Sequence, residues 1–355
     1  MMKMAAAMAA AVCHCNAAPS VPSTMMAVKK RGIFPCNAPF NCVETFTTKV
    51  PTPGPGQLLI KVAGSSVNPC DVDFLETGVG CSGGGGILGM DAAGTVVSLG
   101  ANPSGRFAVG DTVWTDIAGG RGTTGGMAEY AVLDDANTGL APSTLNATAA
   151  GTIPLAALTS IEMFERVWAA YAGSRSNLTV VVTEGTGGTG FIALQLAKHV
   201  YNATRVVTAT SGATDIALAK SLGADVVVDY KVADIFSTLP VDSVDVVIDN
   251  YGARGTADKA MPSIRPGGVY LVLPGGGGGT ISKNPKQGVK QIDFGFTSSG
   301  DHANLDALRS MFDAGHLRAV LYAQVPLADA KTAFQLSKSG VVAGKVAVVP
   351  PMTKH

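Results

Sequence analysis

Charged and aromatic side chains are scarce in this chain of 355 residues. Asp, Glu, Lys and Arg together account for 15% of the sequence, and Phe, Trp and Tyr for 6%. The 26 basic residues (Lys and Arg) are balanced by 26 acidic ones, so the formal net charge is zero. Because no excess of positive charge is available to displace counterions from phosphates, we expect no nucleic-acid partner.

The sequence also lacks the long apolar runs of an integral membrane protein. No run approaches the roughly 18 apolar residues of a membrane-spanning helix, so we expect no membrane span. Apolar residues still make up 46% of the chain, which is too many for a disordered protein. With 44 glycines and about 150 residues per domain, the sequence predicts a soluble, glycine-rich α/β protein of two or three domains.

Cysteine is confined to the first quarter of the chain, and no two cysteines form a Cys-x-x-Cys pair. The segment Cys13-His14-Cys15 is not a structural zinc site by itself, because such sites need four ligands at wider spacing. Disulfide scaffolds are typical of small secreted domains rather than of long chains with large cores. We therefore expect free thiols at Cys13, Cys15, Cys36, Cys42, Cys70 and Cys81.

The N-terminal segment, residues 1–24, differs in composition from the rest of the chain. It contains one lysine, an apolar run over residues 4–12 and then small residues and prolines, and no acidic residue precedes Glu44. This pattern fits a short signal peptide, an organelle presequence or a disordered tail. We leave these alternatives and the localisation open, and exclude the segment from the fold prediction.

Between residues 50 and 145 the sequence reads as short β-strands separated by turns rich in Gly, Pro, Asn and Asp. Short strands at this spacing predict a partly open β-barrel. The predicted strands include Gln57–Val62, Ala93–Gly100, Asp111–Trp114 and Ala128–Leu133.

From about residue 146 strands and helices alternate, which predicts a doubly wound parallel sheet with helices on both faces. Continuous apolar runs predict strands at Leu178–Thr183, Arg205–Ala209, Asp225–Asp229, Val244–Asp249 and Gly268–Leu273. Amphipathic segments predict helices at Thr152–Ala172, Phe191–Val200, Thr214–Leu222 and Asn304–Gly315. The elements after residue 300, which end with a strand at Lys345–Val349, are expected to complete the barrel.

A glycine-rich turn, Thr183–Gly190, lies directly between a predicted strand and a predicted helix. Glycine permits a tight turn and close approach of a ligand, and a helix beginning near Gly188 would aim free N–H groups at a diphosphate. The alternative is a plain strand-to-helix turn, but the array of strands and helices after it favours dinucleotide binding. The predicted contacts are Gly185, Thr186, Gly187, Gly188, Thr189 and Gly190.

The end of the next strand bears on the choice of cofactor. An NAD enzyme typically carries an acidic residue there for the ribose 2′-hydroxyl, whereas this chain has Thr210, Ser211 and Gly212. With no carboxylate to repel a 2′-phosphate and two hydroxyls to donate to it, the sequence favours NADP(H). Alternatively, these residues only cap the helix that starts near Thr214.

Further short motifs accompany the glycine turn: Pro53–Gly56, Ser66–Asp71, Gly89–Gly94, Val109–Val113, Gly126–Tyr130, Pro154–Thr159, Lys220–Asp225 and Gly344-Lys345. In this order they resemble the zinc-free branch of the medium-chain dehydrogenase/reductase superfamily, the group of quinone oxidoreductases and enoyl or alkenal reductases. The resemblance extends over roughly residues 25–350.

The resemblance implies a GroES-like catalytic domain of residues 25–145 and 300–355 and a Rossmann domain of residues 146–299. It also implies a homodimer and hydride transfer from NADPH in the cleft between the domains. Zinc-dependent relatives carry a catalytic Cys, a His-Glu pair and a second Cys at positions that here hold Pro69, Met90-Asp91 and Leu155. Their structural zinc lobe is missing too, so we expect no metal site.

The resemblance also implies roles for single residues. Asn68 would lie near the nicotinamide and the substrate, the alternative being that it caps the turn before Pro69. The remaining implied contacts are Thr159 at the nicotinamide ribose, Ser211 and Tyr230 at the adenosine 2′-phosphate, Asn250 and Tyr251 after the fourth strand, Leu273 near the nicotinamide and Phe296 on the substrate side.

Three positions depart from the family pattern. Asp73 stands where some relatives carry a Tyr proton donor, Asp215 where a basic residue often binds the 2′-phosphate, and Glu184 where the residue is usually small. Because an ionised Asp73 cannot donate a proton, water or the ribose hydroxyl is the expected source.

The sequence therefore predicts an NADPH-dependent oxidoreductase that transfers hydride to a quinone or an α,β-unsaturated carbonyl compound without zinc. Two alternatives remain open: a non-catalytic NADP(H)-binding protein that senses redox state, and an enoyl reductase of a biosynthetic pathway. The substrate is not identified, because its pocket is formed by loops from separate segments.

Overall fold

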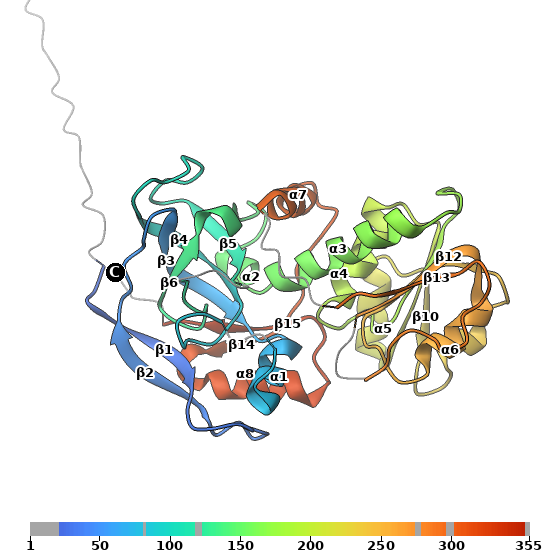
Figure 1. The fold of residues 1–355 in the computed structure, drawn as a ribbon, viewed down its shortest axis with the longest axis horizontal. Coiled ribbons are helices and arrows are strands. Elements are labelled where there is room, and N and C mark those ends of the chain that lie inside the picture. Colours follow the sequence, from blue (N-terminus) through green and yellow to red (C-terminus); the bar gives the residue numbers. More distant parts are fainter. Residues whose placement is uncertain (1–20, 81–82, 118–122, 274–277, 296–301, 352–355) are drawn as a thin grey trace, which may run out of the picture.

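The computed structural model describes residues 21–80, 83–117, 123–273, 278–295 and 302–351. Two large sheets lie at opposite ends of the molecule, with the long helix α3 (Pro154–Ala170) running between them (Figure 1). The predicted presequence or tail falls almost entirely outside the described residues, and Cys13, Cys15, Cys81 and Phe296 fall outside them as well.

The first sheet has six parallel strands, and its core strands are buried on both faces, as predicted. Val180 and Val246 pack in a core with Phe164 of α3, whereas the adjacent Val181 and Val247 face a second core on the other side. The strand order is β10 (Val226–Asp229), β9 (Arg205–Thr210), β8 (Thr179–Val182), β11 (Val244–Asp249), β12 (Ile264–Val272) and β13 (Lys290–Asp293).

The helix after the glycine turn begins at Gly190, one residue before the predicted range Phe191–Val200 and two residues after Gly188. The backbone N–H of Gly187 donates to the carbonyl oxygen of Glu184 at 2.9 Å, so the chain closes a tight turn before it enters the helix. The helical segments around this sheet, besides α3, are α4 (Gly190–Gln195) with a π-helical continuation at Leu196–Val200, α5 (Ala213–Ser221), α6 (Thr256–Ala260), and 3-10 turns at Ile235–Thr238 and Met261–Ser263.

The second sheet joins strands from both ends of the chain, as the sequence predicts. Ala347 of the last described strand pairs with Ser66, and among the described strands of this sheet only the last two along the chain are parallel to each other. The path is β14 (Leu321–Pro326), β15 (Lys345–Val349), β3 (Gln57–Ser66), β4 (Asp91–Leu99), β5 (Thr112–Asp116) and β7 (Thr138–Leu140), and β6 (Tyr130–Asp134) pairs with β3. Together with the parallel sheet it gives the predicted α/β fold of a GroES-like barrel and a Rossmann-like sheet.

The N-terminal region contains elements that the sequence did not predict. The strands β1 (Thr24–Lys30) and β2 (Val43–Lys49) form an antiparallel hairpin, and α1 (Pro69–Thr77) follows β3.

Pairing of β1 with β2 brings the α-carbons of Cys36 and Cys42 to 6.2 Å, and the two residues form a disulfide. The expectation of free thiols is therefore wrong at these two positions, while Cys70 is buried and forms no disulfide with another described residue.

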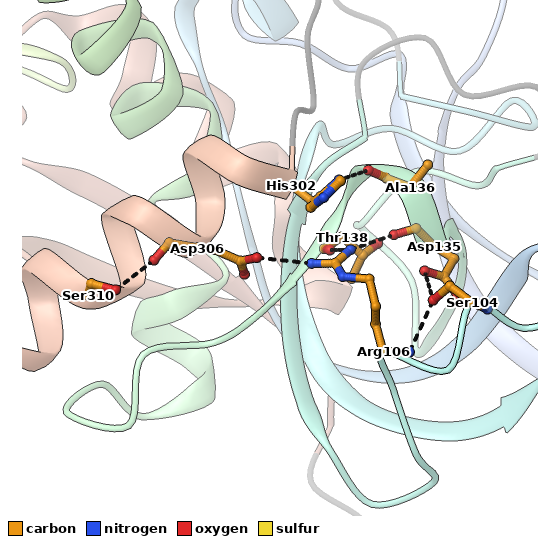
Figure 2. Close-up of polar contacts among 8 residues, drawn as sticks. All are labelled: Ser104, Arg106, Asp135, Ala136, Thr138, His302, Asp306 and Ser310. Carbon is orange, nitrogen blue, oxygen red and sulfur yellow. Dashed lines mark hydrogen bonds and ion pairs between the residues drawn. The ribbon is translucent and has the colours of Figure 1, made fainter.

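Helix α7 (His302–Asp313) is attached to the barrel at its first turn (Figure 2). Arg106 donates to the carbonyl oxygen of Thr138 at 3.0 Å and to the Asp306 carboxylate at 3.2 Å. The remaining helical segments are α2 (Ala147–Ala150), α8 (Ala330–Ser339), and 3-10 turns at Asp135–Asn137 and Leu327–Asp329. Within the described ranges, no helix combines the length and apolar character needed to cross a membrane.

Candidate functional site

The glycine turn and the end of β11 meet at the carboxyl edge of the parallel sheet. β8 and β11 are neighbours there, and the sheet continues through β9 and β10 on one side and β12 and β13 on the other. Thr183 Oγ1 donates to Asp249 at 2.8 Å and accepts the backbone N–H of Asn250 at 2.9 Å. Because ligands of doubly wound sheets bind where the strand order reverses, these contacts place the predicted segments 185–190 and 250–251 at one candidate site.

The glycines of the turn differ in what surrounds them. A β-carbon on Gly185 would overlap the hydroxyl of Thr208, and one on Gly190 would overlap the carbonyl oxygen of Glu184, so packing of the turn itself requires glycine there. For a β-carbon on Gly188, the nearest described atom beyond its chain neighbours is Cδ of Lys345, at 3.8 Å. The fold therefore does not require glycine at position 188, and the space beside its α-carbon is accessible to a ligand.

Several backbone donors of the turn are free. In the described part of the chain, the N–H groups of Gly188 and Thr189 are among those that donate to no acceptor. The hydroxyls of Thr186 and Thr210 are buried and hydrogen-bond each other at 2.9 Å, which fastens the turn to β9. Gly188 and Thr189 thus offer donors, whereas Thr186 and Thr210 hold the turn in shape.

A carboxylate stands beside Ser211, contrary to the expectation from the sequence. Asp229 ends β10 directly opposite Thr210 in the register of β9 and β10. A hydrogen bond from the Ser211 side chain, and next in weight one from the backbone of Lys231, lower the pKa of Asp229. The acidic group comes from the neighbouring strand rather than from the end of β9. Tyr230, which follows it, is 61% exposed.

Asn250, one of the two predicted site residues that follow β11, has a side-chain atom without a hydrogen-bond partner among the described residues. Its Nδ2 donates to the carbonyl oxygen of Thr183 at 3.0 Å, while its buried Oδ1 has no partner among the described residues. A buried acceptor without a donor is a candidate to bind a ligand. Tyr251 beside it is exposed, and Leu273 at the end of β12 is half-buried.

Asn68 lies at the start of α1 in a buried hydrogen-bond network on the barrel side. Its Nδ2 donates to Asp91 at 2.8 Å, and its Oδ1 accepts from Nζ of Lys345. Asp91 also accepts from Ser66 Oγ at 2.6 Å and from the backbone N–H of Leu155 at 2.7 Å. Asn68 is 1% exposed, so its amide is engaged by the protein rather than presented to solvent.

Sequence reasoning did not identify Lys345 as a site residue, and its motif Gly344-Lys345 was the only signal. The side chain is 3% exposed, and Nζ lies 3.6 Å from Asp91 Oδ2. Among the residues that the structure describes, no group of three or more His, Cys, Asp and Glu side chains could hold a metal ion. A buried ammonium, Asn68 and a carboxylate instead occupy the region where the resemblance puts the ligands of zinc-dependent relatives.

Two carboxyl groups near the site have raised pKa values. Burial, opposed mainly by a hydrogen bond from the backbone of Asn68, raises the pKa of Asp71 to about 7. Glu184 has a left-handed backbone, with φ of 54°, and reaches solvent, but protein surrounds it on most sides. This desolvation and then repulsion from Asp249 raise the pKa of Glu184 to about 7. The glycine turn therefore carries an acid that changes charge near neutral pH.

Comparison with known proteins agrees with this arrangement. The family model "Alcohol dehydrogenase GroES-like domain" matches residues 54–143, and "Zinc-binding dehydrogenase" matches residues 222–348. The chain is 32% identical to 2-methylene-furan-3-one reductase of Solanum lycopersicum, with 83% of this chain and 72% of that protein aligned. It is 31% identical to the NADPH-dependent alkenal/one oxidoreductase, chloroplastic, of Arabidopsis thaliana, over 83% of this chain and 72% of that protein.

A further relative and a solved structure extend the likeness. The chloroplast envelope quinone oxidoreductase homolog of Arabidopsis thaliana is 28% identical over 87% of this chain and 94% of that protein. The structure of mycobacterial Rv1454c complexed with NADPH superposes with a TM-score of 0.74 at 25% identity, covering 92% of this chain and all of that one (100%). The chain belongs to the medium-chain dehydrogenase/reductase family of oxidoreductases, in the group of quinone oxidoreductases and alkenal and enoyl reductases.

Proposed function

We propose that the protein is an NADP(H)-dependent oxidoreductase that transfers hydride to a quinone or an α,β-unsaturated carbonyl compound without a metal ion. The observation that supports it most is the open side of Gly188. The protein leaves room for a ligand where its own packing does not require glycine, and the N–H groups of Gly188 and Thr189 are free to donate. An anionic diphosphate fits such a set of backbone donors.

The residues around the turn fit the rest of a dinucleotide. The buried side-chain oxygen of Asn250 accepts no hydrogen bond from a described residue, which suits a ribose hydroxyl or an amide. Exposed Tyr230 and Tyr251 provide flat apolar surface at the same sheet edge. We assign the nicotinamide end to Thr159 and Leu273 and the 2′-phosphate to Ser211 and Tyr230, as the resemblance implies.

When bound, the nicotinamide cofactor supplies the hydride. The protein's part is to hold the hydride donor and the acceptor in the right geometry. We assign this role to Asn68, which Lys345 and Asp91 fix in place and which the resemblance puts near the nicotinamide. Asp91 already accepts three hydrogen bonds and faces an ammonium, so it has little capacity left to bind a cation. This supports chemistry without a metal.

Two observations favour NADPH over NADH, and one opposes it. One of the relatives named above is an NADPH-dependent oxidoreductase, and Ser211 and Tyr230 suit a 2′-phosphate. Asp229 opposes a preference for NADPH, because its carboxylate already accepts a hydrogen bond from the Ser211 hydroxyl and would repel a phosphate bound there. We propose NADP(H), with a preference that Asp229 limits.

The substrate class follows the names of the relatives, which include a furanone reductase, an alkenal/one oxidoreductase and a quinone oxidoreductase homolog. Likeness to a protein named trans-enoyl reductase, at 30% identity over 72% of each chain, keeps an enoyl substrate as the second candidate. We further propose a homodimer, and a domain division at residues 25–145 with 300–355 and 146–299.

The test is NADPH consumption by purified protein dialysed against a chelator, with 1,4-benzoquinone, 9,10-phenanthrenequinone and a short alkenal as separate acceptors. Turnover of at least one acceptor by zinc-free protein is the expected result. Cofactor binding without turnover of any acceptor would favour the non-catalytic alternative. Activity that disappears on dialysis and returns with zinc would refute the metal-free mechanism.

A further inference from the structure

We propose that Lys345 is a positioning residue of this oxidoreductase. Through Asn68 and Asp91 it ties the glycine turn, the start of α1 and the first turn of α3 into one rigid unit at the nicotinamide end of the site. The inference rests on the proposed function, because positioning matters only if hydride transfer takes place there.

The backbone N–H groups of Gly344 and Lys345 donate in different directions, one to the glycine turn and one within the barrel domain. The N–H of Gly344 donates to the carbonyl oxygen of Thr186, inside the glycine turn, at 2.7 Å. The next N–H, that of Lys345, donates to Val320 of the segment before β14 at 3.0 Å. The side-chain stem of Lys345 then passes beside Gly188, where its Cδ would lie 3.8 Å from an added β-carbon. The hydrogen bond from Gly344 thus fixes the position of the lysine next to the turn.

The ammonium fixes which way the Asn68 amide points. A lysine Nζ can only donate and an ionised carboxylate can only accept, so Oδ1 of Asn68 must face Lys345 and Nδ2 must face Asp91. Rotating the amide by 180° would turn its NH₂ group toward the ammonium and its oxygen toward the carboxylate, and neither pair can form a hydrogen bond. Lys345 and Asp91 thus determine the orientation of the one side chain that the resemblance puts beside the nicotinamide and the substrate.

Asp91 extends the same unit to α3. Its Oδ1 accepts the backbone N–H of Leu155, one helical turn before Thr159. Thr159 is the residue expected at the nicotinamide ribose, and Ser160 beside it donates to the carbonyl oxygen of Thr189 at 3.2 Å. The candidate nicotinamide contacts on α1, on α3 and in the turn therefore share one buried ion pair.

The test separates positioning from mere stabilisation. Changing Lys345 alone would leave Asp91 as an uncompensated buried charge, so the variant of choice is the double change Asp91→Asn with Lys345→Met. A matched control is Asp242→Asn with Lys286→Met, because this lysine too pairs with an aspartate; it donates in addition to two backbone carbonyls and lies at a distant edge of the parallel sheet. Circular dichroism establishes folding, and kcat and KM for NADPH are measured on the folded protein.

We expect the Asp91/Lys345 double variant to lose roughly 100-fold in kcat, the effect of a misplacement of about 1 Å, while KM for NADPH changes little. The control pair should keep the wild-type kcat. A folded double variant with the wild-type kcat would overturn the proposal.

A second variant covers the case in which the double variant does not fold. Lys345→Arg keeps the charge, but its planar fork cannot reproduce a single Nζ donor to Asn68, so kcat should fall. A folded Lys345→Arg protein with unchanged kcat would overturn the proposal. Failure of the wild-type protein itself to turn over NADPH with any acceptor would count against the proposed function instead.

Discussion

Gly344 donates its backbone N–H to the carbonyl oxygen of Thr186 at 2.7 Å, and this hydrogen bond joins the start of β15 to the glycine turn of the parallel sheet. The two residues are far apart in the sequence and belong to different sheets. Their contact puts the barrel and the candidate cofactor turn in fixed register, and Lys345 is the next residue in the chain. Changes to the turn, to its neighbours and to the barrel should therefore have separable effects.

Gly188 and Gly190 should respond differently to alanine. Gly190→Ala forces a β-carbon onto the carbonyl oxygen of Glu184, and overpacking of this kind costs about 1–3 kcal/mol of stability. Gly188→Ala meets no protein atom closer than 3.8 Å among the described residues, so its melting temperature should stay near the wild-type value while NADPH binding weakens. Thermal unfolding and cofactor titration of both variants check this. Equal losses of stability would mean that glycine at 188 serves the fold.

NADPH affinity should fall as the pH rises through neutrality. The pKa of Glu184 is raised to about 7, so its carboxyl group is neutral below that pH and carries a negative charge above it. The charge would then repel the diphosphate on the same turn. Titrations between about pH 6 and pH 8 measure the effect, with Glu184→Gln as the variant that should abolish it and Glu44→Gln on the distant hairpin as the control. A pH-dependence that survives in Glu184→Gln would assign the effect to another group.

Asp229 should limit discrimination between the two cofactors. Asp229→Asn removes the negative charge beside Ser211, where we propose that the 2′-phosphate binds, and frees the Ser211 hydroxyl. The ratio of kcat/KM for NADPH to that for NADH should therefore rise several-fold. Asp215→Asn, in the first turn of α5, tests whether any nearby acid has the same effect. An unchanged ratio in Asp229→Asn would show that the phosphate binds elsewhere.

The disulfide between Cys36 and Cys42 should contribute to stability and not to catalysis. It closes a loop of only six residues in sequence separation, for which chain entropy gives about 2 kcal/mol. Replacing both cysteines by serine should lower the melting temperature and leave kcat unchanged. Loss of turnover in the folded variant would connect the hairpin to the active site.

The parallel sheet could be predicted from the sequence because buried parallel strands are continuous apolar runs. The three consecutive valines of β8, Thr179–Val182, form such a run and are buried in the structure. The hairpin could not be predicted, because β2, Val43–Lys49, consists mostly of Thr, Glu and Lys and has one buried residue, Val43. Its partner β1 begins inside the segment excluded from the prediction. Helix α1 has only a weak apolar face, so its periodicity gives no signal.

The site was predictable only where its residues are neighbours in sequence. The glycine turn is one continuous segment between a strand and a helix, and it lies where expected. Asp229 reaches Ser211 through strand pairing, and Lys345 reaches Asn68 across 277 residues. Such contacts depend on the register of strands and on the packing of the two sheets against each other, which no local pattern in the sequence encodes.

The central claim is that a dinucleotide diphosphate binds on the backbone of the glycine turn. Its most direct test is a fluorescence titration of NADPH with the wild-type protein and with Gly188→Asp, both shown to be folded. Saturable binding by the wild-type protein and none by the variant is the predicted result, since the added carboxylate fills the open side of Gly188 and repels the phosphates. Equal affinity in the two proteins would contradict it.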